Sequence, residues 1–245
     1  SPSFAENVAW SDKFDIEVTY YRHNLQGAIQ AIDAQTQLDL CATTQDPQYC
    51  TGINRLASGE IDTFANFLIN LGSIKTDGWD ADLFWTLPET SIGRFKLSWQ
   101  NTFVTRYEAR GAGGQLQPQA PGIVVNDTAI PEWTSTATLD WKQGKWNAAW
   151  SIRHLSEMEE TCLAADPAAF CSSATTNTLA ATTYHDLQLG YDFDWFKGLQ
   201  LTGGVNNVFD EDPPVCTSCS LNGYEASTYD IPGGRFFYVR ANLPF

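Results

Sequence analysis

The chain has 245 residues, of which 43% are hydrophobic, 13% aromatic and 18% charged. This apolar content is too high for a disordered chain, and the net charge of −15 disfavours binding to nucleic-acid phosphates. No stretch approaches the roughly 18 consecutive apolar residues of a membrane-spanning helix. A helical membrane protein is therefore excluded, whereas a membrane β-barrel, whose strands hide their lipid face by alternation, is not.

Alternation of apolar and polar residues with a period of two predicts an all-β chain of about nine strands. One face of each strand carries aromatic and aliphatic side chains, and the other carries Asp, Thr, Asn or Lys. In chain order the predicted strands are Phe4–Trp10, Phe14–Tyr20, Trp79–Leu87, Phe95–Gln100, Trp133–Trp141, Trp146–Ile152, Leu187–Trp195, Leu199–Phe209 and Phe237–Phe245.

The connections between the predicted strands alternate in length. Short ones cover residues 11–13, 88–93, 142–145 and 196–198. Long ones cover roughly residues 28–63, 108–132, 159–181 and 210–232. Short turns on one side and long loops on the other are typical of an outer-membrane barrel with antiparallel strands.

The first long connection contains local signals of its own. Apolar residues at Ala28, Ile29, Ile32 and Leu38 have a spacing that suggests a short helix. The stretch Arg55–Ile61 resembles a small hairpin that turns at Ser58-Gly59.

Six cysteines fall into three local pairs within the long connections. The pairs are Cys41 with Cys50, Cys162 with Cys171, and Cys216 with Cys219. Each lies among Asp, Pro, Ser and Thr, so three local disulfides in an oxidising compartment are the simplest prediction. A zinc site or a redox CxxC stays open as an alternative, although zinc would need a second pair spaced like Cys216 and Cys219.

Five of the nine tryptophans lie within a few residues of a short turn. Indole rings collect where hydrocarbon meets headgroups, so these residues predict an aromatic girdle at one rim of a barrel. They are Trp10, Trp85, Trp141, Trp146 and Trp195. The competing interpretation is a β-sandwich with Trp near its strand ends, but a sandwich hides its apolar faces in a core and needs no such rim.

The C-terminal region resembles TonB-dependent outer-membrane receptors. Asn206-Asn207-Val208-Phe209-Asp210 is similar to the Asn-Leu-Phe-Asp segment near the end of these receptors. Gly234 and Arg235 are similar to their Pro-Gly-Arg motif, and the strand that ends at Phe245 resembles their C-terminal insertion signal. Upstream, residues 69–72 and 76–80 resemble the long strand that enters the second half of these barrels.

This resemblance implies that residues 1–245 are the C-terminal part of one transmembrane β-barrel domain of roughly 22 strands. Nothing in the chain resembles the plug domain or the TonB box of the family. We therefore expect a further N-terminal segment to supply the plug and to complete the barrel, because an open sheet edge in lipid leaves backbone groups unsatisfied. The other expected partners are outer-membrane lipid, TonB acting through the plug, and an extracellular nutrient.

The function implied by the resemblance is energised uptake of a scarce, bulky nutrient such as an oligosaccharide, siderophore or peptide. Tyr49, Tyr107 and Tyr224 are candidate stacking residues of a vestibule formed by long extracellular loops. The loops are acidic and poor in Arg, which slightly favours a neutral or cationic ligand over a polyanionic siderophore.

We expect no catalytic residues, metal ligands or cofactor. No nucleophile elbow or phosphate-binding loop is present, and His23, His154 and His185 are scattered and are expected in the lumen or at the rim. The alternatives from other classes are a secreted β-sandwich module that binds carbohydrate and a small hydrolase on an outer-membrane barrel.

Overall fold

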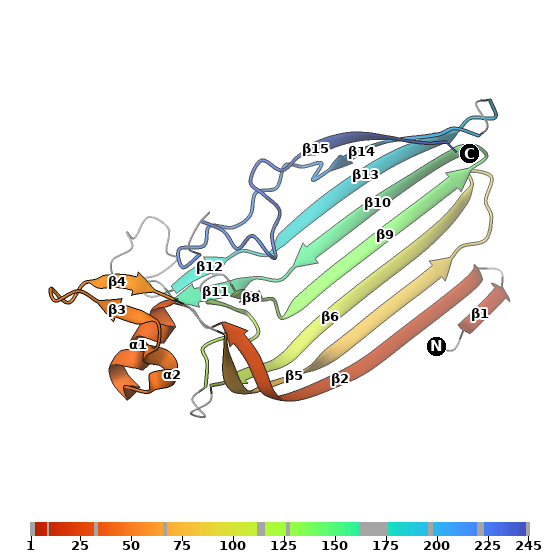
Figure 1. Cartoon of the computed structure of the whole chain (residues 1–245). Helices are drawn as coiled ribbons and strands as arrows, with labels where there is room; N and C mark the ends of the chain where they lie inside the picture. Colours follow the sequence, from red (N-terminus) through yellow and green to blue (C-terminus); the bar gives the residue numbers. More distant parts are fainter. Residues whose placement is uncertain are drawn as a thin grey trace. The chain divides into compact units, whose positions relative to one another are not determined.

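The computed structural model of the chain describes most of its length and is drawn in Figure 1. The described residues are 3–8, 10–31, 34–65, 68–111, 116–125, 128–161, 176–195, 198–219 and 223–243. Among them, nine strands form one sheet in the order β1-β2-β5-β6-β9-β10-β13-β14-β15. Their bounds are β1 Ser3–Val8, β2 Ser11–Ala31, β5 Leu68–Thr86, β6 Arg94–Arg110, β9 Trp133–Gln143, β10 Trp146–Leu155, β13 Thr182–Asp192, β14 Gln200–Asn206 and β15 Phe236–Asn242.

The predicted all-β fold and its strands are confirmed, but three strands are much longer than predicted. β2 extends to Ala31, β5 begins at Leu68 and β6 extends to Arg110. In these extensions the alternation fades, as in Tyr21-Arg22-His23-Asn24. A ladder of backbone hydrogen bonds needs no apolar face, so a strand can continue where the pattern of side chains no longer shows it.

The register of the sheet gathers the apolar side chains on one face, which we call the apolar face. One row crosses the six strands from β6 to β15, all paired antiparallel. Its members are Leu97, Leu139, Trp150, Leu187, Val205 and Phe237. The adjacent row, Lys96, Asp140, Ala149, Gln188, Gly204 and Tyr238, lies on the opposite side, the polar face.

The apolar face is exposed along this sheet. Trp150, Leu187 and Phe237 retain 42%, 44% and 69% of their accessible surface. A β-sandwich would bury such a face against a second sheet, so this arrangement gives the sandwich interpretation no support.

The connections alternate in length as predicted. Residues 87–93, 144–145 and 193–199 join neighbouring strands at one end of the sheet, the short-turn end. Residues 32–67, 111–132, 156–181 and 207–235 join them at the other end, the long-loop end. The described helices are α1 (Ala34–Thr44) and α2 (Pro47–Cys50), and neither is long and apolar enough to cross a membrane.

The first long connection contains two helices and a hairpin. The hairpin is confirmed as β3 (Ile53–Arg55) and β4 (Ile61–Phe64), with Gly59 at a φ of +93° in the turn. The expected helix start at Ala28 was wrong, because Ala28 and Ile29 still belong to β2 and α1 begins at Ala34. Helix α2 begins with Pro47 after Asp46, whose carboxylate accepts the Gln48 N–H over 2.9 Å.

The chain forms two compact units, each with its own packing. One contains residues 1–22, 77–106 and 119–245, and the other contains residues 23–76 and 107–118. In the larger unit the long connections contribute a second sheet of four strands, in the order β12-β11-β7-β8. These strands are β7 (Ile123–Val125), β8 (Thr128–Ile130), β11 (Met158–Thr161) and β12 (Thr176–Leu179).

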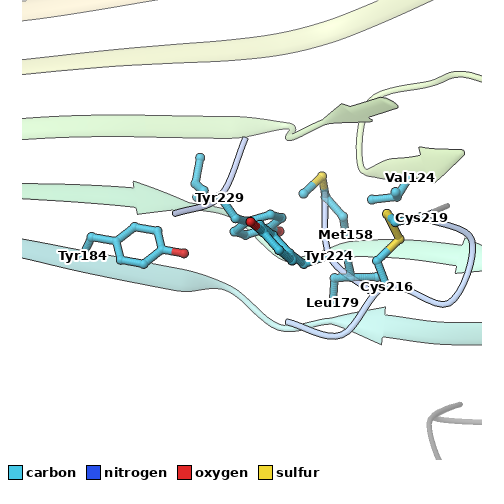
Figure 2. Close-up of a cluster of buried hydrophobic side chains, with 9 residues drawn as sticks. Val124, Met158, Leu179, Tyr184, Cys216, Cys219, Tyr224 and Tyr229 are labelled. Carbon is cyan, nitrogen blue, oxygen red and sulfur yellow. A yellow bond between two sulfur atoms is a disulfide. The ribbon is translucent and has the colours of Figure 1, made fainter. Parts of the chain in front are cut away.

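The main buried cluster of the larger unit lies among these connections (Figure 2). Its members come from β7, β10, β11, β12, β13 and the β14–β15 connection. They are Val124, Leu155, Met158, Leu179, Tyr184, Cys216, Cys219, Tyr224 and Tyr229. The long loops therefore pack around a core of their own, which gives them a defined structure.

Candidate functional site

The two C-terminal sequence motifs form the neck of the β14–β15 connection. Asp210 accepts the Arg235 N–H over 3.3 Å, and its carboxylate lies 3.7 Å from the Arg235 guanidinium. Asp212 accepts the Gly233 N–H over 2.8 Å. Two segments more than twenty residues apart are thereby joined at the point where the loop leaves the sheet, next to Gly234.

Asn207 is the buried centre of this neck. Its side-chain NH₂ donates to the Glu211 carbonyl and its side-chain oxygen accepts the Glu211 N–H, both over 2.9 Å. Its own N–H donates to Asp186 on β13 over 2.8 Å. Asn207 and Asp210 have φ values of +49° and +60°, a conformation that Asn and Asp tolerate better than most residues. Asn206 ends β14 beside Asn207, and Phe209 extends to the apolar face, where its ring lies 4.9 Å from that of His185.

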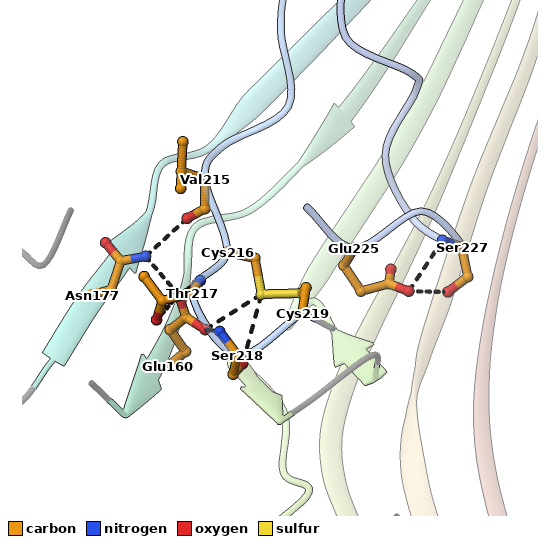
Figure 3. Close-up of a disulfide and its surroundings, with 9 residues drawn as sticks. All are labelled: Glu160, Asn177, Val215, Cys216, Thr217, Ser218, Cys219, Glu225 and Ser227. Atoms are coloured by element: carbon orange, nitrogen blue, oxygen red, sulfur yellow. Dashed lines mark hydrogen bonds between the residues drawn. A yellow bond between two sulfur atoms is a disulfide. The ribbon is translucent and has the colours of Figure 1, made fainter. Parts of the chain in front are cut away.

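Beyond this neck, the buried carboxylate of Glu160 on β11 accepts hydrogen bonds from four donors (Figure 3). Asn177 Nδ2, Thr217 N and Thr217 Oγ1 donate to Oε1 over 2.7, 2.6 and 3.0 Å. Ser218 N donates to Oε2 over 2.8 Å. The Cys216 sulfur lies 3.3 Å from Oε2, but a disulfide sulfur has no proton to donate. We call this arrangement of Glu160 and residues 216–219 the Glu160 clamp.

The Glu160 clamp favours an ionised carboxylate. Burial opposes ionisation, but the hydrogen bonds from Ser218, Asn177 and Thr217 together lower the pKa of Glu160 below its ordinary value. The backbone N–H groups of Thr217 and Ser218 thus form a small anion-binding nest that is filled from within the chain. The sequence showed Glu160 only as one acid among several in a loop.

The disulfide prediction is confirmed for two pairs, Cys41–Cys50 and Cys216–Cys219, and no described cysteine is free. The first links α1 to α2, and the second closes the turn whose N–H groups bind Glu160. Cys162 and Cys171 lie outside the described residues, as does Phe245. Within the described part of the chain, no group of three His, Cys, Asp or Glu side chains is placed to hold a metal ion.

The three tyrosines predicted to form a vestibule have different surroundings. Tyr224 is buried in the loop cluster with 8% of its surface exposed (Figure 2), and Tyr49 is buried in α2 with 3% exposed. Neither ring presents an open stacking face in this conformation. Tyr107 is half-buried near the end of β6. The stacking role of the three tyrosines stays a prediction, with Tyr107 as the most accessible of the three rings in this conformation.

The five predicted girdle tryptophans lie at or near the short-turn end. Trp10 contacts Phe14 and Trp85, with ring centroids 5.6 and 6.3 Å apart. Trp146 packs against Tyr191 at 4.7 Å, and Trp195 against Phe193 at 5.4 Å. Trp141 donates its indole N–H to the Ile92 carbonyl over 2.6 Å.

A second group of rings lies on the apolar face toward the long-loop end, and the sequence did not reveal it. Phe103 stacks on Trp133 at 6.0 Å, and Trp133 contacts His154 at 4.7 Å. Trp150 donates its indole N–H to Nδ1 of His185 over 3.2 Å. These rings come from strands β6, β9, β10 and β13, so only the sheet register brings them together.

Comparisons with known proteins agree with this geometry. The sequence matches the family described as TonB dependent receptor-like, beta-barrel over residues 7–208. No curated protein sequence matches the chain.

Similar solved structures include the siderophore receptor PirA from Acinetobacter baumannii, with 13% identity and a TM-score of 0.52. It is aligned over 97% of this chain and 30% of its own. The copper transporter OprC has 14% identity and a TM-score of 0.51, with 94% of this chain and 29% of its own covered. The FrpB iron transporter from Neisseria meningitidis has 15% identity and a TM-score of 0.50, again with 94% and 29% covered. The chain thus spans about three tenths of the length of these relatives.

Proposed function

Because the chain belongs to the β-barrel family of TonB-dependent receptors, we propose that it forms the C-terminal part of the wall of an outer-membrane nutrient transporter. The observation that carries this proposal is the division of one nine-stranded sheet into an exposed apolar face and a polar face, continuous across the register from β6 to β15. The family match over residues 7–208 covers most of that sheet.

In this proposal the apolar face contacts lipid and the polar face lines the lumen. The two groups of aromatic rings, one toward each end of the apolar face, suit the two interfaces of a bilayer. Barrels of this kind have short periplasmic turns and long extracellular loops, so the β14–β15 connection and the Glu160 clamp would lie outside the cell.

The ligand class that we propose is a metal ion or metal complex, or another bulky nutrient, with neutral or positive charge. The similar structures are named as a siderophore receptor, a copper transporter and an iron transporter. In this chain the loops present exposed acids such as Glu157, Glu159 and Glu211. A vestibule of this charge attracts cations and repels polyanions.

Uptake by cells that produce the full-length receptor tests this function. Growth and radiolabel accumulation would be compared for iron and copper complexes of positive, zero and negative charge, with the other transporters for these metals deleted. We expect accumulation of a neutral or cationic complex that disappears in a strain without TonB. Accumulation that is the same without TonB, or no accumulation of any complex, would count against the proposal.

A further inference from the structure

The Cys216–Cys219 disulfide lies against the Glu160 carboxylate (Figure 3). The Cys216 sulfur is 3.3 Å from Oε2 of Glu160, and as part of a disulfide it has no proton to donate across that distance. A thiol at the same position has a proton and can donate it. The Ser218 hydroxyl, 3.6 Å from the same sulfur, can donate to it in either redox state. The carboxylate is therefore better matched to reduced Cys216 than to oxidised Cys216.

Glu160 can accept this additional hydrogen bond without losing those that it already accepts. Its Oε2 accepts the Ser218 N–H over 2.8 Å, and a carboxylate oxygen has two lone-pair sites. The Thr217 N–H donates to Oε1 over 2.6 Å. These two bonds do not involve sulfur, so they are made in both redox states and cancel in the reduction equilibrium. The hydrogen bond from the Cys216 thiol is made only in the reduced state, which it stabilises.

The same carboxylate distinguishes this CxxC from a catalytic one. Catalytic CxxC pairs are reactive because positive charge or a helix N-terminus stabilises a thiolate. Here the N–H groups of Thr217 and Ser218 are already bound to the negative charge of Glu160. That charge disfavours a thiolate at Cys216, so the reduced pair persists as two thiols and attacks other disulfides slowly.

We propose that Cys216–Cys219 is a redox-responsive disulfide, which a small dithiol reduces and whose dithiol form Glu160 stabilises. The proposal concerns the β14–β15 connection itself and holds whichever nutrient the receptor takes up. Reduction removes the covalent link from residues 216–219, whereas the bonds of their N–H groups to Glu160 remain. The turn therefore opens more often in the reduced state and keeps its fold.

Reduction proceeds by thiol–disulfide exchange in two steps. A thiolate of the reductant attacks the sulfur of Cys219, because the charge of Glu160 repels it from Cys216. The bond between the two cysteines breaks, and Cys216 leaves and takes up a proton. The second thiol of the reductant then loses its proton and attacks the mixed disulfide, and Cys219 leaves and takes up a proton. The reductant is oxidised to a disulfide by two electrons, and the two cysteines are reduced to thiols.

Burial of the sulfurs favours a small reductant over a protein. Cys216 and Cys219 are only 2% and 6% exposed, so exchange requires a locally open form. In that form the Cys216 N–H releases the Gly223 carbonyl, which it binds over 2.8 Å. Opening limits the rate of exchange and leaves its equilibrium unchanged.

The Cys41–Cys50 disulfide provides an internal comparison. Its cysteines are nine positions apart, against three for Cys216–Cys219, and the chain-entropy model gives the longer loop more stabilisation. The Cys50 sulfur lies 3.5 Å from the Cys41 carbonyl oxygen, which carries no net charge. We therefore expect Cys216–Cys219 to be reduced under milder conditions than Cys41–Cys50.

Equilibration of the full-length receptor in detergent with mixtures of reduced and oxidised dithiothreitol tests the proposal. Alkylation of free thiols, followed by mass spectrometry, reports each cysteine pair separately. We expect Cys216–Cys219 to be half reduced at a several-fold lower ratio of reduced to oxidised dithiothreitol than Cys41–Cys50. Glu160→Gln should raise the ratio that Cys216–Cys219 requires about fivefold, or about 20 mV, because a neutral amide oxygen accepts the thiol more weakly. Glu159→Gln, on the exposed neighbour, is the matched control and should leave the ratio unchanged.

Reduction of Cys216–Cys219 only at the ratio that reduces Cys41–Cys50, or at a higher one, would overturn the proposal, and this comparison needs no variant. An unchanged or lower ratio in Glu160→Gln would do the same. In the reduced wild type, hydrogen exchange at the Thr217 and Ser218 amides should be faster than in the oxidised receptor and slower than the intrinsic rate. Exchange at the intrinsic rate would show that Glu160 does not hold the reduced turn, which also contradicts the proposal.

Discussion

At the scale of single residues, the Glu160 clamp shows how one buried charge can organise a loop. A buried carboxylate is costly unless its oxygens accept hydrogen bonds, and here three donors approach Oε1 and one approaches Oε2. Two of those donors are backbone N–H groups of the β14–β15 connection. The Glu160 carboxylate therefore fixes the conformation of residues 216–219, which lie more than fifty residues away in the chain.

Replacement of Glu160 by Gln should loosen residues 216–219. The amide keeps the shape of the side chain, but its NH₂ group would face donors, so we expect a loss of about 1–3 kcal/mol of local stability. Hydrogen exchange of the Thr217 and Ser218 amides measures this loss of local stability. Glu159→Gln, on the exposed neighbour of Glu160, is the matched control and should leave both amides protected. Equal protection in wild type and Glu160→Gln would contradict the role of the clamp.

The same site predicts the effect of pH. Because the folded-state pKa of Glu160 is lowered, its contribution to stability is fully present above the ordinary carboxyl pKa of about 4.3. That contribution is lost as the pH falls through the lowered value. Exchange at Thr217 and Ser218, corrected for the intrinsic rate, should therefore accelerate below about pH 4 in wild type and depend less on pH in Glu160→Gln.

At the scale of secondary-structure elements, β14 and β15 are fitted together by a glycine and an aromatic ring. Gly204 faces Tyr238 in the register, and the tyrosine ring occupies the space that a β-carbon at position 204 would need. The Tyr238 hydroxyl donates to Gln188 on β13. One ring thus covers a glycine and joins three strands on the polar face.

Gly204→Ala should destabilise this part of the sheet by about 1–3 kcal/mol, because the Tyr238 ring must move and its hydrogen bond to Gln188 is lost. Gly203→Ala is a matched control on the apolar face, where the nearest heavy atom to the new β-carbon would be 4.0 Å away. Urea unfolding of the receptor in detergent distinguishes the two variants. A larger loss for Gly203→Ala would show that the ring does not determine the fit.

At the scale of the whole molecule, the exposed apolar face is the property that a membrane explains. Leu189 is 49% exposed on this face, and Gln188 points to the polar face. Leu189→Lys should reduce folding into lipid vesicles by about 2–4 kcal/mol if the residue meets the bilayer midplane. Gln100→Lys, at an exposed position of the polar face, introduces the same charge on the other side of the sheet and should be tolerated. Similar folding yields for both variants would argue against a lipid-facing sheet.

Much of the fold follows from local pattern. Alternation along Leu187–Tyr191 or Trp146–Ile152 distinguishes the two faces of a strand without knowledge of its neighbours, because successive side chains point to opposite sides. Turn length and composition likewise indicated which end of the sheet carries the loops, and the spacing of Cys41 with Cys50 and of Cys216 with Cys219 indicated their disulfides. Local patterns indicated the family through three short segments and left their structural role unexplained.

Features made by residues that are distant in the sequence could be found only in the tertiary structure. Examples are the contact of Asp210 with Arg235, the donors around Glu160, and the rings of Phe103, Trp133 and His154. All of them depend on strand register and loop closure. The same is true of Tyr224, whose sequence surroundings indicate an exposed loop but which the loop cluster buries. Periodicity is a property of neighbouring residues and is written in the chain, whereas a site depends on which distant segments meet, and packing decides that.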